Sequence, residues 1–225
     1  MTIKGVFFDA ADVLYRRPKS TRTYVSSLLK EQGLSTQLSP EAGMRHETLR
    51  SLANCGHLSP EDYWDQLLQM HGMTATEERK AVIDKINAYS DQIVPIAGGR
   101  ELLAELKQRG FLLGVITDTI YPIERKMQWL DRVGVSEFID VMACSTMIGA
   151  HKPHPAIYLS ALQQAGLAPN ESAFVGHDAD ELEGARSVGI ATVAVNYDPS
   201  ARADYYALSL VDLLDVPLFQ ASRAL

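Results

Sequence analysis

The region after Pro95 alternates regularly between helical and strand patterns, and this alternation constrains the fold more than any other feature of the sequence. Residues 101–109 form an amphipathic pattern that stops at Gly110, and the apolar run at residues 111–117 follows. Strands that are separated by helices of this length imply right-handed crossovers and a parallel sheet. The predicted helices cover residues 101–109, 123–133, 155–165 and 181–188, and the predicted strands cover residues 111–117, 138–144, 173–176 and 192–195.

A further buried strand is predicted at residues 6–9, and a purely helical region separates it from the alternating region. Within that region Ser39-Pro40-Glu41 and Ser59-Pro60-Glu61 each combine an N-cap residue with proline and an acid in the first helical turn. The helices predicted there cover residues 24–30, 42–53, 63–70 and 79–89. We therefore predict an α/β chain with a parallel-sheet core domain at residues 1–15 and 93–225 and an all-helical subdomain at residues 16–92.

Composition limits the classes of partner. The formal net charge of −7 argues against nucleic acid or an anionic membrane surface as the main partner. Cys55 and Cys144 are too few and too far apart for a disulfide framework, which suits a reducing compartment, and no run of 18 apolar residues occurs. We expect a cytoplasmic protein that binds no nucleic acid and no membrane, as a monomer or a homodimer.

Polar residues follow the predicted strands at the ends where an open parallel sheet binds its ligands. Asp9 closes the first strand, Thr117 closes another, and a cluster of acids that includes Asp178 and Glu181 follows the strand at residues 173–176. Lys152 lies just ahead of the helix that begins at residue 155. A carboxylate, a hydroxyl and an ammonium that converge on one edge of a sheet can perform covalent phosphoryl transfer.

In such a reaction Asp9 would attack phosphorus, and Lys152 and Thr117 would stabilise the charge on the transferred oxygens. Mg²⁺ suits an oxygen site built from Asp9, Asp178 and Glu181, where it would bring the nucleophile and the phosphate together. The substrate expected for this arrangement is a small anionic molecule.

Four segments resemble, in order and in separation, the four motifs of the haloacid dehalogenase (HAD) superfamily. They are FFDAADVLY, VITDT, GAHKPHPAIY and FVGHDADELEGARSVGI, and the similarity extends from residue 3 to about residue 215. The resemblance implies a Rossmann-like core, a mobile helical cap at residues 16–92, and a nucleophile at Asp9, with Thr117 in the second motif and Lys152 in the third. Most members of the superfamily are Mg²⁺-dependent phosphatases, and a minority are metal-free dehalogenases.

The sequence departs from the family pattern at positions that matter for mechanism. Ala11 stands where phosphatases carry a second Asp as acid and base, and Asp12 stands where a Gly is usual, so Asp12 is a candidate replacement. His177 stands where an Asp is expected, and Glu181 replaces the second Asp of that motif. Either Asp178 takes over as a metal ligand or Mg²⁺ binding is weakened, and His177 could be a loop residue or an active-site group.

The missing acid at Ala11 affects the choice of substrate, because losing a placed general acid costs about 10²- to 10⁴-fold in rate. The leading interpretation is a Mg²⁺-dependent phosphatase that acts through Asp9, with Asp12, Thr117 and Lys152 as helpers, and that prefers good leaving groups. The alternatives are a metal-independent dehalogenase, since halide needs no proton, and a catalytically silent HAD-like binding protein.

Overall fold

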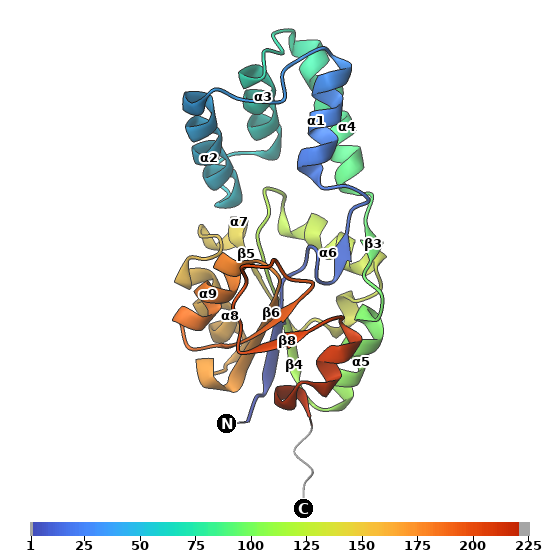
Figure 1. Ribbon diagram of the computed structural model, residues 1–225, viewed down its shortest axis with the longest axis vertical. Helices are drawn as coiled ribbons and strands as arrows, with labels where there is room; N and C mark the ends of the chain where they lie inside the picture. Colours follow the sequence, from blue (N-terminus) through green and yellow to red (C-terminus); the bar gives the residue numbers. More distant parts are fainter. Residues whose placement is uncertain (1, 221–225) are drawn as a thin grey trace, which may run out of the picture.

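The computed structural model describes residues 2–220, and its largest element is a sheet of six parallel strands (Figure 1). The strands follow the order β5-β4-β1-β6-β7-β8. They are β1 (Gly5–Phe8), β4 (Leu112–Thr117), β5 (Val141–Cys144), β6 (Ser172–Gly176), β7 (Ala191–Val195) and β8 (Tyr205–Ala207). The predicted α/β fold with a parallel sheet is confirmed. The predicted core domain included residues 1 and 221–225, which lie outside the described residues.

Strand β1 is the point at which the winding of the sheet reverses. Its neighbours β4 and β6 lie on opposite sides, and the chain continues outward to β5 on one side and to β7 and β8 on the other. In open α/β sheets the crevice beyond the carboxyl end of such a strand is the usual place for a ligand. The residue that follows β1 is Asp9.

Helices cover both faces of the sheet, which explains why β1 is apolar throughout. Successive side chains of a strand point to opposite faces, so Phe8 packs in one cluster and Phe7 in the other. The helices are α5 (Gly99–Gln108) and α6 (Ile123–Arg132) on the first face and α8 (Pro155–Ala165) and α9 (Ala179–Ser187) on the second. None of the helices within residues 2–220 combines the length and apolar character needed to span a bilayer.

The strand predicted at residues 138–144 was placed too early. Residues Ser136–Phe138 form a 3₁₀ turn, and β5 begins only at Val141. The apolar side chains of Phe138 and Ile139 are partly buried against the core, so their pattern reflected packing of a loop and not a strand. Strand β8 and the short helix α7 (Ser145–Ile148) were not predicted.

The region between β1 and α5 forms four helices, as predicted, and these stand above the sheet in Figure 1. They are α1 (Thr21–Glu31), α2 (Pro40–Asn54), α3 (Pro60–Met70) and α4 (Thr76–Ser90). The side chains of Ser39 and Ser59 cap α2 and α3 by accepting backbone N–H bonds, which accounts for both helix starts. The four helices bury their own cluster, which includes Leu29, Trp64 and Leu68, and two short antiparallel strands, β2 (Tyr15–Arg16) and β3 (Val94–Pro95), connect them to the sheet.

Tyr121 joins the helical region to the sheet region. Its hydroxyl accepts a hydrogen bond from the indole Nε1 of Trp64 at 3.3 Å and lies 2.9 Å from the hydroxyl of Ser90. On the other side its ring packs edge-on against Trp129 of α6, with ring centroids 5.6 Å apart. Tyr121 therefore contacts α3, α4 and α6 at once.

Candidate active site

Asp9 lies at the carboxyl end of β1, where the ends of three strands meet. Phe8 is level with Val115 of β4 and with Val175 of β6, and the Asp9 amide donates to the carbonyl of Val175 at 2.9 Å. The Asp9 residue is only 4% exposed. The sheet therefore fixes the backbone of this carboxylate and removes its side chain from bulk water.

Lys152 is buried beside Asp9 and bridges two carboxylates. Its Nζ lies 2.6 Å from Asp9 Oδ1 and 2.7 Å from Glu181 Oε1. Its backbone amide donates to Asp118 Oδ1 at 3.0 Å, which holds the segment before α8 against the end of β4. Residues from four separate parts of the sequence thus form one buried charged group.

Carboxyl groups outnumber ammonium groups in this buried cluster. Burial raises the pKa of Glu181 to about 8, and the neighbouring Asp9 carboxylate adds to the shift, although Lys152 opposes it. Burial also raises the pKa of Asp118. Burial alone would lower the pKa of Lys152, but Asp9, Glu181 and Asp118 outweigh it and raise that pKa above its usual value. One ammonium therefore faces three carboxyl groups, an arrangement that favours binding a further cation.

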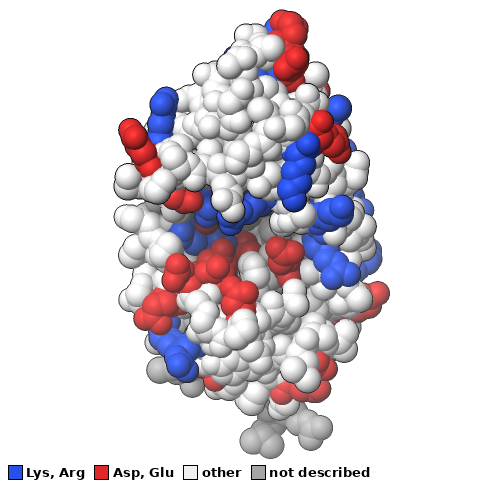
Figure 2. Space-filling model, turned by 45° about the horizontal axis from the view of Figure 1, so that its top comes forward, with Lys and Arg blue, Asp and Glu red and all other residues white. Residues whose placement is uncertain are grey.

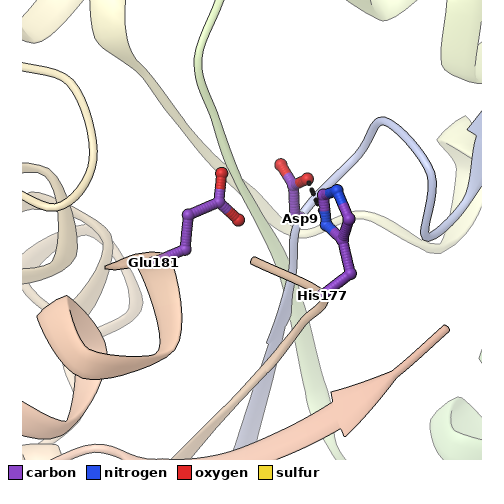
Figure 3. Close-up of side chains that lie close together, drawn as sticks. All are labelled: Asp9, His177 and Glu181. Atoms are coloured by element: carbon purple, nitrogen blue, oxygen red, sulfur yellow. Dashed lines mark ion pairs between the residues drawn. The ribbon is translucent and has the colours of Figure 1, made fainter. Parts of the chain in front are cut away.

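His177 adds an imidazole to the carboxyl groups of Asp9 and Glu181, as Figure 3 shows. One potential ligand atom from each of these residues lies within 4.8 Å of the other two. The His177 Nδ1 is 3.6 Å from Asp9 Oδ2, which is longer than a hydrogen bond. The His177 Nδ1 and Glu181 Oε2 are buried atoms that make no hydrogen bond within residues 2–220.

Asp178, predicted to be a metal ligand, lies outside the group that Asp9 and Glu181 form with His177. Its Oδ1 accepts backbone bonds from Asp180 at 2.8 Å and from Glu181 at 3.4 Å, so Asp178 is the N-cap of α9. It is not part of the three-residue group around Asp9. Of the three predicted ligands, the structure brings Asp9 and Glu181 together and uses Asp178 to start the helix that carries Glu181.

The other two predicted catalytic residues differ in their surroundings. Thr117 is 1% exposed at the end of β4, next to β1, and its hydroxyl donates to the carbonyl of Asp118 at 3.4 Å. Asp12 is exposed and has a left-handed backbone with φ of 60°, which agrees with its place at a position where the family usually has Gly. Catalytic roles for both residues remain predictions.

Two supporting residues were missed as parts of the site. Asp118 was visible as a strand-end residue, but its bond to the Lys152 backbone depends on the approach of a distant loop. Tyr158 of α8 donates its hydroxyl to the carbonyl of Glu181 at 2.7 Å. No sequence signal separates Tyr158 from the other buried residues of its helix, because it occupies the same helical spacing as residues that only pack in the core.

Replacing Gly184 of α9 by Ala should destabilise the protein by about 1–3 kcal/mol and reduce activity. A Cβ at this position would lie 2.8 Å from the carbonyl oxygen of Pro153 and 2.8 Å from the hydroxyl of Tyr158. The clash would separate α9, which carries Glu181, from the turn that follows Lys152.

Urea denaturation measures the change, and Gly43→Ala in α2 is the matched control because a Cβ there meets nothing within 4 Å. The control should be stabilised by about 0.5–1 kcal/mol through helix propensity. Equal stability of the Gly184→Ala and Gly43→Ala proteins would contradict the close packing at Gly184.

Figure 2 shows the surface above the sheet edge as a hollow between the sheet region and the helical region. Asp and Glu side chains gather on the side of the sheet, and Lys and Arg side chains border the hollow from the helical side and from one flank. A basic border attracts anions, and an acidic floor attracts cations. The hollow therefore suits an anionic molecule that binds together with a metal ion.

Comparison with known proteins supports a hydrolase family. The family model described as haloacid dehalogenase-like hydrolase matches residues 26–195. A glyceraldehyde 3-phosphate phosphatase of Methanopyrus kandleri is 30% identical over 230 residues, which cover 98% of this chain and 94% of the relative. The pyrophosphatase PpaX of Halalkalibacterium halodurans is 31% identical over 153 residues, or 62% of this chain and 68% of that protein.

Solved structures share the fold over nearly the whole chain. A predicted phosphoglycolate phosphatase from Haemophilus somnus superimposes with a TM-score of 0.70 at 20% identity, covering 96% of this chain and 98% of that one. A defluorinating L-2-haloacid dehalogenase superimposes with a TM-score of 0.69 at 18% identity, covering 95% and 94%. Because the family model matches most of the residues and a relative is 30% identical along almost the full length, this chain belongs to the haloacid dehalogenase-like hydrolases.

Proposed function

We propose that this hydrolase is a phosphatase that acts on a small phosphorylated metabolite through a covalent phosphate on Asp9. The observation that carries the proposal is the buried Asp9 carboxylate, held by Lys152 at 2.6 Å at the switch point of the sheet. The names of the relatives support a phosphatase over a dehalogenase, because three glyceraldehyde 3-phosphate phosphatases match 95% or more of this chain.

In the first step a carboxylate oxygen of Asp9 attacks phosphorus, and the bond from phosphorus to the leaving-group oxygen breaks. The Lys152 ammonium neutralises charge on the nucleophile and on the transferred oxygens, and burial at 4% exposure strengthens that interaction. Water then attacks phosphorus, which releases inorganic phosphate and restores the Asp9 carboxylate.

The leaving group determines the preferred substrates. Ala11 cannot donate the proton that an alkoxide requires, and Asp12 has an exposed side chain. Acyl and aryl phosphates depart as weakly basic anions and do not need that proton. We therefore expect these compounds to react faster than alkyl phosphate monoesters.

Mg²⁺, the cofactor that the family resemblance implies, fits the donor atoms only in part. The oxygens of Asp9 and Glu181 are ligands that Mg²⁺ accepts, but the third member of the group is the imidazole of His177. Mg²⁺ is held by oxygen ligands and keeps several of its waters. We therefore assign no step of the reaction to Mg²⁺.

A phosphate-release assay with acyl, aryl and alkyl phosphates, including glyceraldehyde 3-phosphate, tests the proposal. Each compound is measured with Mg²⁺, with Mn²⁺ and with EDTA. We expect good leaving groups to be preferred, and we expect Ala11→Asp to raise turnover of alkyl monoesters by ~10-fold or more while leaving aryl phosphates nearly unchanged. Absence of release from every compound under all conditions would contradict the phosphatase proposal.

Ala11 also supports a second candidate, a dehalogenase. In that reaction Asp9 would attack the carbon that bears the halogen, the carbon–halogen bond would break to release halide without a proton, and water would hydrolyse the resulting ester at Asp9. Halide release from 2-haloacids in EDTA distinguishes this activity. A protein that releases neither phosphate nor halide would be a HAD-like binding protein.

A further inference from the structure

We propose that Asp9, His177 and Glu181 form a site for a transition-metal cation that binds imidazole, such as Mn²⁺, in preference to Mg²⁺. The proposal rests on the proposed function in one respect, since the cation would serve the Asp9 chemistry. Binding of the cation is nevertheless measurable without turnover.

The geometry fits a single ion. Asp9 follows β1, His177 follows β6 and Glu181 lies in the first turn of α9, so three elements that meet at the switch point each contribute a ligand. Their nearest potential ligand atoms lie within 4.8 Å of one another. Two ligands on opposite sides of a divalent ion lie about 4.2–4.6 Å apart, given bonds of about 2.1–2.3 Å, so small side-chain rotations suffice.

Two of the atoms that would bind the ion lack any other partner. The His177 Nδ1 and Glu181 Oε2 are buried and make no hydrogen bond to the rest of residues 2–220. A buried polar atom without a partner costs about 1–3 kcal/mol. Both atoms belong to residues of the group around Asp9, so one ion bound there would give them a partner.

The backbone holds His177 in place. Its carbonyl accepts a hydrogen bond from the amide of Asp198 at 3.1 Å, and the residue directly follows the buried strand β6. The Asp178 carboxylate caps α9 immediately afterwards, which fixes the path of the chain from His177 to Glu181. The imidazole therefore extends from a rigid strand end and not from a free loop.

The donor set selects the class of cation. Imidazole nitrogen suits first-row transition metals, whereas Mg²⁺ favours oxygen and water. With His177 the group has two carboxylates in place of three, and Lys152 already lies within 2.7 Å of both. An imidazole in place of a carboxylate therefore lowers Mg²⁺ affinity for two reasons: nitrogen is a poorer ligand for Mg²⁺ than oxygen, and the site loses one negative charge.

The test uses the full chain, stripped of metal with EDTA, and Mn²⁺ as the probe. Electron paramagnetic resonance measures the Mn²⁺ dissociation constant, Mg²⁺ competition gives the relative affinity, and spin-echo modulation detects ¹⁴N bonded to Mn²⁺. We expect Mn²⁺ to bind at least ~10-fold more tightly than Mg²⁺, with a ¹⁴N signal from one imidazole. His177→Asp should abolish the ¹⁴N signal and lower the ratio of the Mg²⁺ to the Mn²⁺ dissociation constant at least ~10-fold. His57→Asp should change neither the signal nor the ratio.

His57 is a matched control because it is an exposed histidine in the helical region. Thermal denaturation checks that each variant is folded, and His177→Asn removes the imidazole without adding a charge. Mn²⁺ binding without a ¹⁴N signal in the wild-type protein would overturn the proposal. Phosphate release with no ¹⁴N signal refutes this proposal alone, while a ¹⁴N signal with no phosphate release refutes only the proposed phosphatase.

Discussion

Replacing Asp9 by Asn should reduce turnover by on the order of 10⁴-fold or more, because an amide cannot act as the nucleophile that a carboxylate provides. The amide keeps the shape of the side chain, and its oxygen can still accept the hydrogen bond from Lys152. Lys152 also keeps the Glu181 carboxyl group as a partner at 2.7 Å. The variant should therefore remain folded while losing activity.

Steady-state phosphate release measures the loss, and mass spectrometry of acid-quenched protein should detect phosphorylation of the wild-type chain only. Asp12→Asn is the matched control, because it makes the same change three residues away at an exposed position. An Asp9→Asn protein with more than a tenth of the wild-type rate would exclude Asp9 as the nucleophile. A large loss in Asp12→Asn would instead support the predicted catalytic role of Asp12.

Replacing Lys152 by Met should destabilise the protein by about 3–5 kcal/mol at pH 7, because removing one partner of a buried ion pair leaves uncompensated charge. Here the loss would leave the buried Asp9 carboxylate beside Glu181 without the ammonium that balances its charge. Turnover should also fall, because Lys152 balances the charge of the nucleophile. Among residues 2–220, the only other basic side chain within 4.0 Å of the Asp9 carboxylate is the imidazole of His177. Urea denaturation in EDTA measures the change in free energy of unfolding.

Lys107→Met is the control for this measurement. Lys107 pairs with Asp140 at 2.8 Å, but both side chains are more than a third exposed, and such surface pairs contribute about 0–1 kcal/mol. Similar losses in the Lys107→Met and Lys152→Met proteins would show that burial adds nothing to the Lys152 pair.

The pH dependence of stability has a definite sign. The pKa of Glu181 rises from 4.5 to about 8 in the folded protein, so the folded state holds a proton that the unfolded state has released. The contribution of Glu181 to stability is complete below pH 4.5 and is lost as the pH rises to about 8. Lys152→Met should extend this decline to higher pH, because it removes the ammonium that opposes the rise in the pKa of Glu181, and acidification should therefore partly restore its stability.

Much of the fold and part of the site could be predicted, because the carboxyl ends of all strands in a parallel sheet lie at the same edge, however far apart they are in the sequence. A short apolar strand that ends in Asp9 and a Lys-Pro pair ahead of a helix were visible in the sequence. The sheet order places β1 between β4 and β6, so Asp9, Thr117 and the residues after Gly176 share one edge. The contact of Asp9 with Lys152 follows from that topology.

The roles of His177 and Asp178 could not be assigned in the same way. In the turn after β6, a change of one position decides whether a side chain faces Asp9 or the backbone of α9. The choice depends on the capping bonds that Asp178 makes to Asp180 and Glu181, which are properties of the folded turn. Sequence spacing alone therefore could not decide which of the two side chains would face Asp9.

The contacts of Tyr121 have an optical consequence. The chain contains two tryptophans, and Tyr121 touches both, since its hydroxyl binds the indole of Trp64 and its ring packs on Trp129. Trp64 belongs to the helical region and Trp129 to the sheet region. The tryptophan fluorescence of this protein thus originates from the contact between the helical region and the sheet region, and a shift of one region against the other would change the emission of both indoles.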